Sequence, residues 1–66
     1  MPFISIVTPT FNEQENIENF CSAIKSEMQK ISIDYEHIII DNFSTDKTVE
    51  IVKNLINDNK KIKLIV

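Results

Sequence analysis

The segment Ile38–Thr48, which reads Ile-Ile-Ile-Asp-Asn-Phe-Ser-Thr-Asp-Lys-Thr, decides the fold of this chain. Its first three residues are β-branched and apolar, as expected of a strand that is buried on both faces in a parallel sheet. Asp41 and Asn42 follow at the carboxyl end of that strand, and the capping side chains of residues 44–46 precede a helical pattern. Ligands of open α/β sheets bind beyond the carboxyl ends of the strands, so we expect the functional site here.

The rest of the chain predicts a βαβαβ order. Apolar, β-branched segments predict strands at residues 3–7, 35–40 and 62–66. Apolar residues at helical spacing predict a first helix capped by Asn12, with Glu15 completing a capping box, and a second helix from about residue 46 to 57. Strand–helix–strand units of this length make parallel crossovers, so the fold class is α/β with a parallel sheet, half of a doubly wound domain.

The third predicted strand, Ile62–Val66, has no covering helix after it. A parallel sheet left in this state exposes apolar edges. We therefore expect residues 1–66 to be the truncated N-terminal part of a larger domain, and the open edge to allow self-association.

Composition excludes several classes of function. The 66 residues carry a net charge of −3 with seven lysines and no arginine, which disfavours a nucleic-acid partner. The single cysteine, Cys21, cannot form an internal disulfide and fits a cytoplasmic chain. No apolar run approaches the roughly 18 residues of a membrane span, so any membrane association would need segments outside this chain. The absence of glycine excludes the glycine-rich dinucleotide and phosphate-loop motifs.

Two polar loops should meet at the carboxyl ends of neighbouring strands, one at residues 8–13 and the other at 41–46. A flat base could stack on Phe11 while Glu13 or Asp41 accepts hydrogen bonds from its N–H groups. The residues by themselves therefore predict a base or nucleotide pocket.

Each of these side chains also has a structural interpretation. Asp41 could bond the backbone of its own loop, and Phe11 could pack against the start of the helix. Glu13 could complement the helix dipole. Ser44 and Asp46 are expected to be helix caps. His37 is expected to be a packed histidine, because it has no partner motif.

The residues Ser5–Glu13 read Ser-Ile-Val-Thr-Pro-Thr-Phe-Asn-Glu and precede the Ile38–Thr48 motif in the order seen in one enzyme family. Together the two motifs closely resemble the start of the family-2 glycosyltransferases, inverting enzymes of the Rossmann-like GT-A fold that use nucleotide sugars. The resemblance covers essentially the whole chain. The runs starting at Asn12 and Tyr35 look most like the dolichyl- and polyprenyl-phosphate glycosyltransferase branch, which implies cell-envelope polysaccharide biosynthesis.

The resemblance implies a role for each matching residue. Pro9, Phe11 and Glu13 would line the base pocket, with Phe11 where tyrosine is commoner. Asp41 would bind the base or the ribose. Asn42 takes a position often filled by a second aspartate, and its role is open.

Two residues depart from the family pattern, since Phe43 and Lys47 replace the two usual glycines. A residue with a Cβ atom adopts positive φ only at a cost. Either the turn at Phe43 differs from that of the family, or Phe43 is strained.

The implied donor is a UDP- or GDP-sugar, and the implied acceptor is a hydroxyl or a polyprenyl phosphate. The family's Asp-x-Asp, which holds Mg²⁺ or Mn²⁺, and its catalytic base are expected beyond the third strand. We therefore name no catalytic residue and no metal ligand, and expect these 66 residues alone to be inactive. The full-length form would act in the cytoplasm or at the cytoplasmic face of a membrane.

One alternative stays open, namely a non-catalytic truncated α/β domain that acts in packing or association. A receiver-like or flavodoxin-like module is disfavoured, because Thr8-Pro9-Thr10 stands where a receiver needs an acidic pair.

Overall fold

The computed structural model describes residues 3–66 and has the predicted α/β architecture. The elements follow in the order β1 (Phe3–Thr10), α1 (Ile17–Ile31), β2 (Asp34–Asp41), α2 (Thr48–Asp58) and β3 (Ile62–Ile65). The βαβαβ order and the fold class expected from the sequence are thus confirmed.

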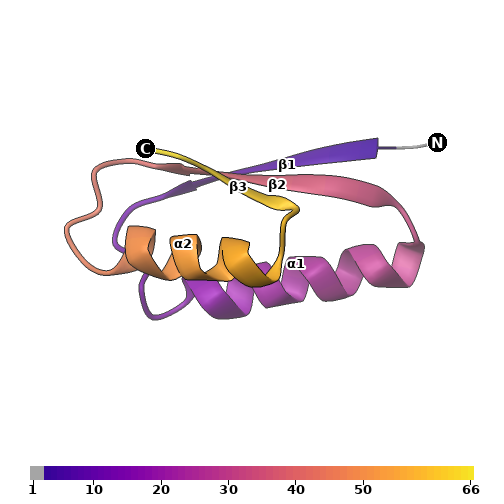
Figure 1. Cartoon of the computed structure of the whole chain (residues 1–66), viewed down its shortest axis with the longest axis horizontal. Helices are drawn as coiled ribbons and strands as arrows, with labels where there is room; N and C mark the ends of the chain where they lie inside the picture. Colours follow the sequence, from indigo (N-terminus) through magenta and orange to yellow (C-terminus); the bar gives the residue numbers. More distant parts are fainter. Residues whose placement is uncertain (1–2) are drawn as a thin grey trace.

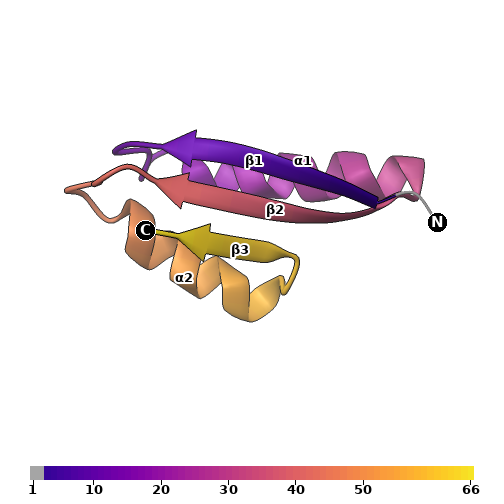
Figure 2. The same ribbon diagram turned by 90° about the horizontal axis from the view of Figure 1, so that it is seen from above.

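The strands form one parallel sheet with β2 in the middle. Its order is β1-β2-β3, and the register pairs Thr10 with Asp41 and Ile40 with Ile65. Figure 2 shows the strands side by side and pointing the same way, so that the loops after β1 and β2 leave from the same edge. The predicted meeting of these two loops follows from this register.

Both helices cover the same face of the sheet (Figure 1). Both strand–helix–strand connections are expected to be right-handed, and both step in the same direction across the sheet, from β1 to β2 and from β2 to β3. Two such connections place their helices on the same face. The core lies between the sheet and the two helices, where apolar residues of β2 and β3 meet those of the helices. It consists of Ile17, Cys21, Ile39, Val52 and Ile62. Burial of this layer is the main source of stability.

The other face of the sheet is bare in the part of the chain that the structure describes. Along β2, Ile39 faces the helices and is 0% exposed, whereas its neighbour Ile40 is 40% exposed. The expectation that this strand is buried on both faces is therefore wrong for residues 3–66. Polar side chains also cross this face, because Ser5 donates a hydrogen bond to Glu36, which is paired with Lys63 at 3.9 Å.

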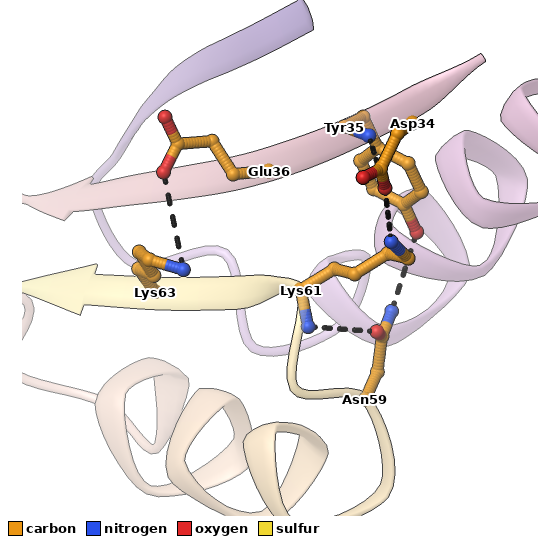
Figure 3. A network of polar contacts seen from close by, with 6 residues as sticks. All are labelled: Asp34, Tyr35, Glu36, Asn59, Lys61 and Lys63. Carbon is orange, nitrogen blue, oxygen red and sulfur yellow. Dashed lines mark hydrogen bonds and ion pairs between the residues drawn. The ribbon is translucent and has the colours of Figure 1, made fainter. Parts of the chain in front are cut away.

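A polar network fastens β3 to the start of β2, at the end of the sheet opposite the two loops (Figure 3). The Lys61 ammonium pairs with Asp34, and the Lys61 N–H donates to the Asn59 side chain at 3.1 Å. The Asn59 amide in turn donates to the Tyr35 hydroxyl at 3.4 Å. These contacts hold the polar turn before β3 against β2.

The helices begin later than the capping signals predicted. Helix α1 starts at Ile17, and its N-cap, Asn16, makes no side-chain capping bond. The predicted capping box at Asn12 is therefore wrong, because the Asn12 side chain bonds the other loop instead. The N-cap of α2 is Lys47 and not Asp46, but the Asp46 carboxylate accepts the N–H of Thr48, the first residue of α2, at 2.9 Å.

Replacement of Ile39 by alanine should destabilise the fold by about 2–5 kcal/mol, because it leaves a cavity in the core between the helices and the sheet. Urea denaturation followed by circular dichroism measures this loss. The matched control is Ile40→Ala on the bare face, which should cost far less. Equal losses in the two variants would contradict the one-sided core.

Candidate functional site

The candidate site is built from the loops β1–α1 (residues 11–16) and β2–α2 (residues 42–47). They start side by side because Thr10 and Asp41 are partners in the sheet. The Asn42 N–H continues this pairing by donating to the Thr10 carbonyl at 2.9 Å. The two loops therefore form one rim at the carboxyl edge of the sheet (Figure 2).

The Asp41 carboxylate lies at the centre of this rim and joins its parts. Its Oδ1 accepts hydrogen bonds from the hydroxyls of Thr10 at 2.9 Å and Ser44 at 2.6 Å. Its Oδ2 accepts the N–H of Ser44 at 2.9 Å. A carboxylate has roughly four acceptor positions. Since three are taken, about one remains, on Oδ2.

These contacts keep Asp41 ionised. Burial of the side chain, which is 6% exposed, works to raise its pKa, but the hydrogen bonds from Ser44 and Thr10 prevail and lower the pKa below its ordinary value. Asp46 behaves in the same way, because hydrogen bonds from Thr48 and Gln14 overcome its desolvation and lower its pKa. The rim is therefore anionic at neutral pH.

The two loops are joined by hydrogen bonds from side chains to backbone N–H groups. Side chains of the second loop and of Thr48 accept the N–H groups of the first, and side chains of the first accept those of the second. The pairs are Asn12 N–H to Ser44 Oγ (2.9 Å), Glu13 N–H to Thr48 Oγ1 (2.8 Å), Gln14 N–H to Asp46 Oδ2 (3.2 Å), Thr45 N–H to Asn12 Oδ1 (2.8 Å) and Lys47 N–H to Gln14 Oε1 (3.0 Å).

This joining has a chemical consequence for phosphate binding. Phosphate sites at helix N-termini need backbone N–H groups that point at the ligand. The N–H groups of residues 12–14 and of Thr45, Lys47 and Thr48 already have acceptors within the protein. These particular N–H groups are therefore not available to a phosphate group.

The structure brings the predicted site residues to one edge, but only some of them share a pocket. Pro9 and Glu13 line a pocket of about 220 Å³ beside β1 and the start of α1. Ligand pockets usually measure roughly 300–1,000 Å³, so this one fits only part of a nucleotide sugar. Asp41 and Asn42 are not among its lining residues. Phe11 is 56% exposed, which speaks against its packing onto the helix start.

His37 is a packed residue, as expected from the sequence. Its Nε2 lies 3.0 Å from the Thr8 hydroxyl, and its ring meets that of Phe20 edge to face with 5.8 Å between centroids. Burial lowers the pKa of His37 and keeps the ring neutral. The side chain supports the wall of the pocket, because Thr8 and Phe20 both line it.

Sequence reasoning missed three residues that hold the site together, namely Thr10, Asn12 and Thr48. Thr48 is fully buried and bridges the loops, a role that its place at the end of the Ile38–Thr48 segment does not indicate. Ser44 was expected to cap the helix, but its hydroxyl bonds Asp41 and Asn12 instead. A hydroxyl residue at the end of β1 facing an aspartate at the end of β2 was the available signal for Thr10.

Within residues 3–66, no group of three histidine, cysteine or acidic side chains lies close enough to hold a metal ion. We therefore assign no described residue to a metal.

Replacement of Thr48 by valine should destabilise the protein by about 1–3 kcal/mol, because it leaves the Glu13 N–H without its acceptor and removes a donor from Asp46. Thermal or urea unfolding measures the loss. Thr45→Val is the control, since the Thr45 hydroxyl is exposed and its bond to Asn12 is long, at 3.4 Å. A loss in the control as large as in Thr48→Val would refute the bridging role.

Acid should weaken the fold through the same network. A carboxyl whose folded pKa is lowered contributes stability that is complete above the unfolded pKa, about 3.9 for aspartate, and that is lost as pH falls through the folded pKa. We expect urea midpoints to be constant above about pH 5 and to drop as the pH falls below that value toward the folded pKa. Asp41→Asn should be less stable at neutral pH and should lose less on acidification. An unchanged pH dependence in this variant would contradict the assignment.

Comparison with known proteins shows which family the sequence matches. Residues 5–66 match the glycosyl transferase family 2. An uncharacterized glycosyltransferase of Haemophilus influenzae is 37% identical over 97% of this chain and 24% of its own length. A GalNAc(5)-diNAcBac-PP-undecaprenol beta-1,3-glucosyltransferase of Campylobacter jejuni is 41% identical over 96% of the chain and 19% of its own length. A dolichol-phosphate mannosyltransferase of Pyrococcus furiosus is 36% identical over 79% and 14%.

The chain spans less than a quarter of the length of these relatives. Its match to the family nevertheless covers nearly all of its residues, including both loops of the rim. The chain therefore belongs to glycosyl transferase family 2.

Proposed function

We propose that this chain forms the nucleotide-binding part of an inverting glycosyltransferase that transfers sugar from a UDP- or GDP-sugar to an acceptor hydroxyl or polyprenyl phosphate. The observation that carries the proposal is the Asp41 carboxylate. It is ionised, rigidly held at the carboxyl edge of the sheet, and left with about one acceptor position on Oδ2. Family membership supports the same reading.

The chemistry of this edge suits a nucleobase. A single free acceptor position matches a single ring N–H donor, such as N3–H of uracil or N1–H of guanine. Phe11, more than half exposed, offers a face on which the base can stack. Glu13 is exposed, lines the neighbouring pocket and can accept a further hydrogen bond from the base or ribose. Pro9 and Asn42 complete the proposed nucleotide site.

The remaining machinery is proposed to belong to the rest of the protein. Several backbone N–H groups of the rim already have acceptors, so we propose that the diphosphate is bound elsewhere, next to Mg²⁺ or Mn²⁺ held by an Asp-x-Asp. Such a metal would neutralise the charge of the leaving diphosphate. Residues 1–66 alone are then proposed to bind nucleotide without transferring sugar.

The proposed acceptor class follows the relatives. Two of them carry names that specify undecaprenol-linked and dolichol-phosphate substrates. We propose a polyprenyl-linked acceptor at the cytoplasmic face of a membrane, within cell-envelope polysaccharide biosynthesis. Neither helix in residues 3–66 is long and apolar enough to cross a membrane.

Titration of the ¹⁵N-labelled protein with UDP and with GDP, each with Mg²⁺, tests the proposal. We expect one nucleotide to shift the amide signals of Phe11, Glu13 and Asp41. Replacement of Glu13 by glutamine should weaken that nucleotide by about tenfold, because a hydrogen bond to a charged acceptor is lost.

Glu15→Gln provides the matched control, since it makes the same change two residues further along the same loop, outside the pocket lining. It should leave the affinity unchanged. A folded protein whose signals respond to neither nucleotide would reject the proposal and favour the alternative, a non-catalytic domain that acts in packing or association.

A further inference from the structure

One aromatic residue of the rim, Phe43, has an unusual backbone conformation. Phe43 has φ 60°, in the left-handed region. That region is costly for a residue with a Cβ atom and is normally left to glycine. Of the two possibilities raised by the sequence, the structure shows the second. The turn keeps the left-handed conformation, and Phe43 is strained in it.

The backbone conformation has a clear cause. The turn from Asp41 to Ser44 folds back so that the Ser44 N–H and hydroxyl both reach the Asp41 carboxylate, at 2.9 and 2.6 Å. Glycine at position 43 would allow the same turn without strain. The hydrogen bonds therefore explain why the backbone is left-handed, but not why the residue is phenylalanine.

Packing within the described chain does not explain the ring either. Phe43 is 85% exposed, so its ring gains little from burial. The other two positive-φ residues differ from it. The Asn12 side chain bonds the second loop, and Ser32 caps the end of α1 through its N–H to Gln29. Residues held in strained conformations without local compensation are found at ligand sites.

Phe43 lies close in the chain to the proposed nucleotide-binding residues. It lies two residues after Asp41, and Phe11 lies one residue after Thr10, the sheet partner of Asp41. Two exposed aromatic residues thus follow the paired ends of neighbouring strands, within two residues of Asp41 or of its sheet partner Thr10. This is an arrangement that suits a flat heteroaromatic ring.

We propose that Phe43 is a base-stacking residue, which adds a second aromatic contact to that of Phe11 in the nucleotide site. The inference rests on the proposed function and extends it by one specificity-determining residue. The strain at position 43 is tolerated because the ring binds the nucleobase of the donor.

The test compares Phe43→Gly with Phe43→Tyr in titrations with UDP and GDP, followed by isothermal calorimetry and by the ¹H signals of the base. Phe43→Gly should bind about tenfold more weakly, as expected for loss of one stacked aromatic. Its Tm should rise, because glycine relieves the strain. Phe43→Tyr should keep the affinity. The upfield shift that a stacked ring imposes on the base protons should shrink in the glycine variant.

Phe3→Ala is the control, since it removes another exposed aromatic residue at the opposite end of β1 and should change neither affinity nor base shifts. If Phe43→Gly binds as tightly as the unmodified protein with the same base shifts, the stacking role is wrong and the proposed function stands. A lower Tm for Phe43→Gly would show that the ring packs on the protein, which also rejects the inference. If the unmodified protein binds neither nucleotide, both proposals fail.

Discussion

The hydrogen bonds to the Asp41 carboxylate shape the centre of the rim, on which the cross-loop bonds build. They join the end of β1, through Thr10, to the turn that follows β2, through Ser44. The left-handed backbone at Phe43 follows from this turn. Because the donors stabilise the charged form, the same contacts that shape the turn keep the carboxylate ionised. The same hydrogen bonds therefore set both the shape of the turn after β2 and the negative charge of Asp41.

Much of this arrangement could be predicted from local sequence patterns. The apolar run at residues 38–40 predicted the central strand, and the polar residues after it predicted the carboxyl edge as the site. The hydrophobic spacing predicted both helices, since a stripe of residues such as Ile17 and Cys21 must face a sheet. Parallel pairing then followed from the strand–helix–strand order, because such crossovers bring the strand ends to the same edge.

Other features depend on which side chains meet across the fold, and no local pattern contains that information. Asn12 followed by Glu15 reads as a capping box, yet the Asn12 amide oxygen accepts N–H groups of the second loop. A bond between residues 12 and 45 exists only once the strands are paired. The bridging role of Thr48 could not be predicted either, because its partner Glu13 is brought close only by the pairing of the strands. The one-sided core was also missed, because a run of three isoleucines does not show which of its faces a helix covers.

The two loops of the rim contain no glycine, and this bears on whether their backbone N–H groups can bind phosphate. Loops that cradle phosphate leave their backbone N–H groups free, and glycine allows the close approach. Here bulkier residues form the loops, and their side chains occupy those N–H groups in order to hold the rim rigid. Asp41 and Asp46 add negative charge that repels a diphosphate. These properties support the proposal that this part of the chain contacts the base and ribose of a nucleotide rather than its phosphates.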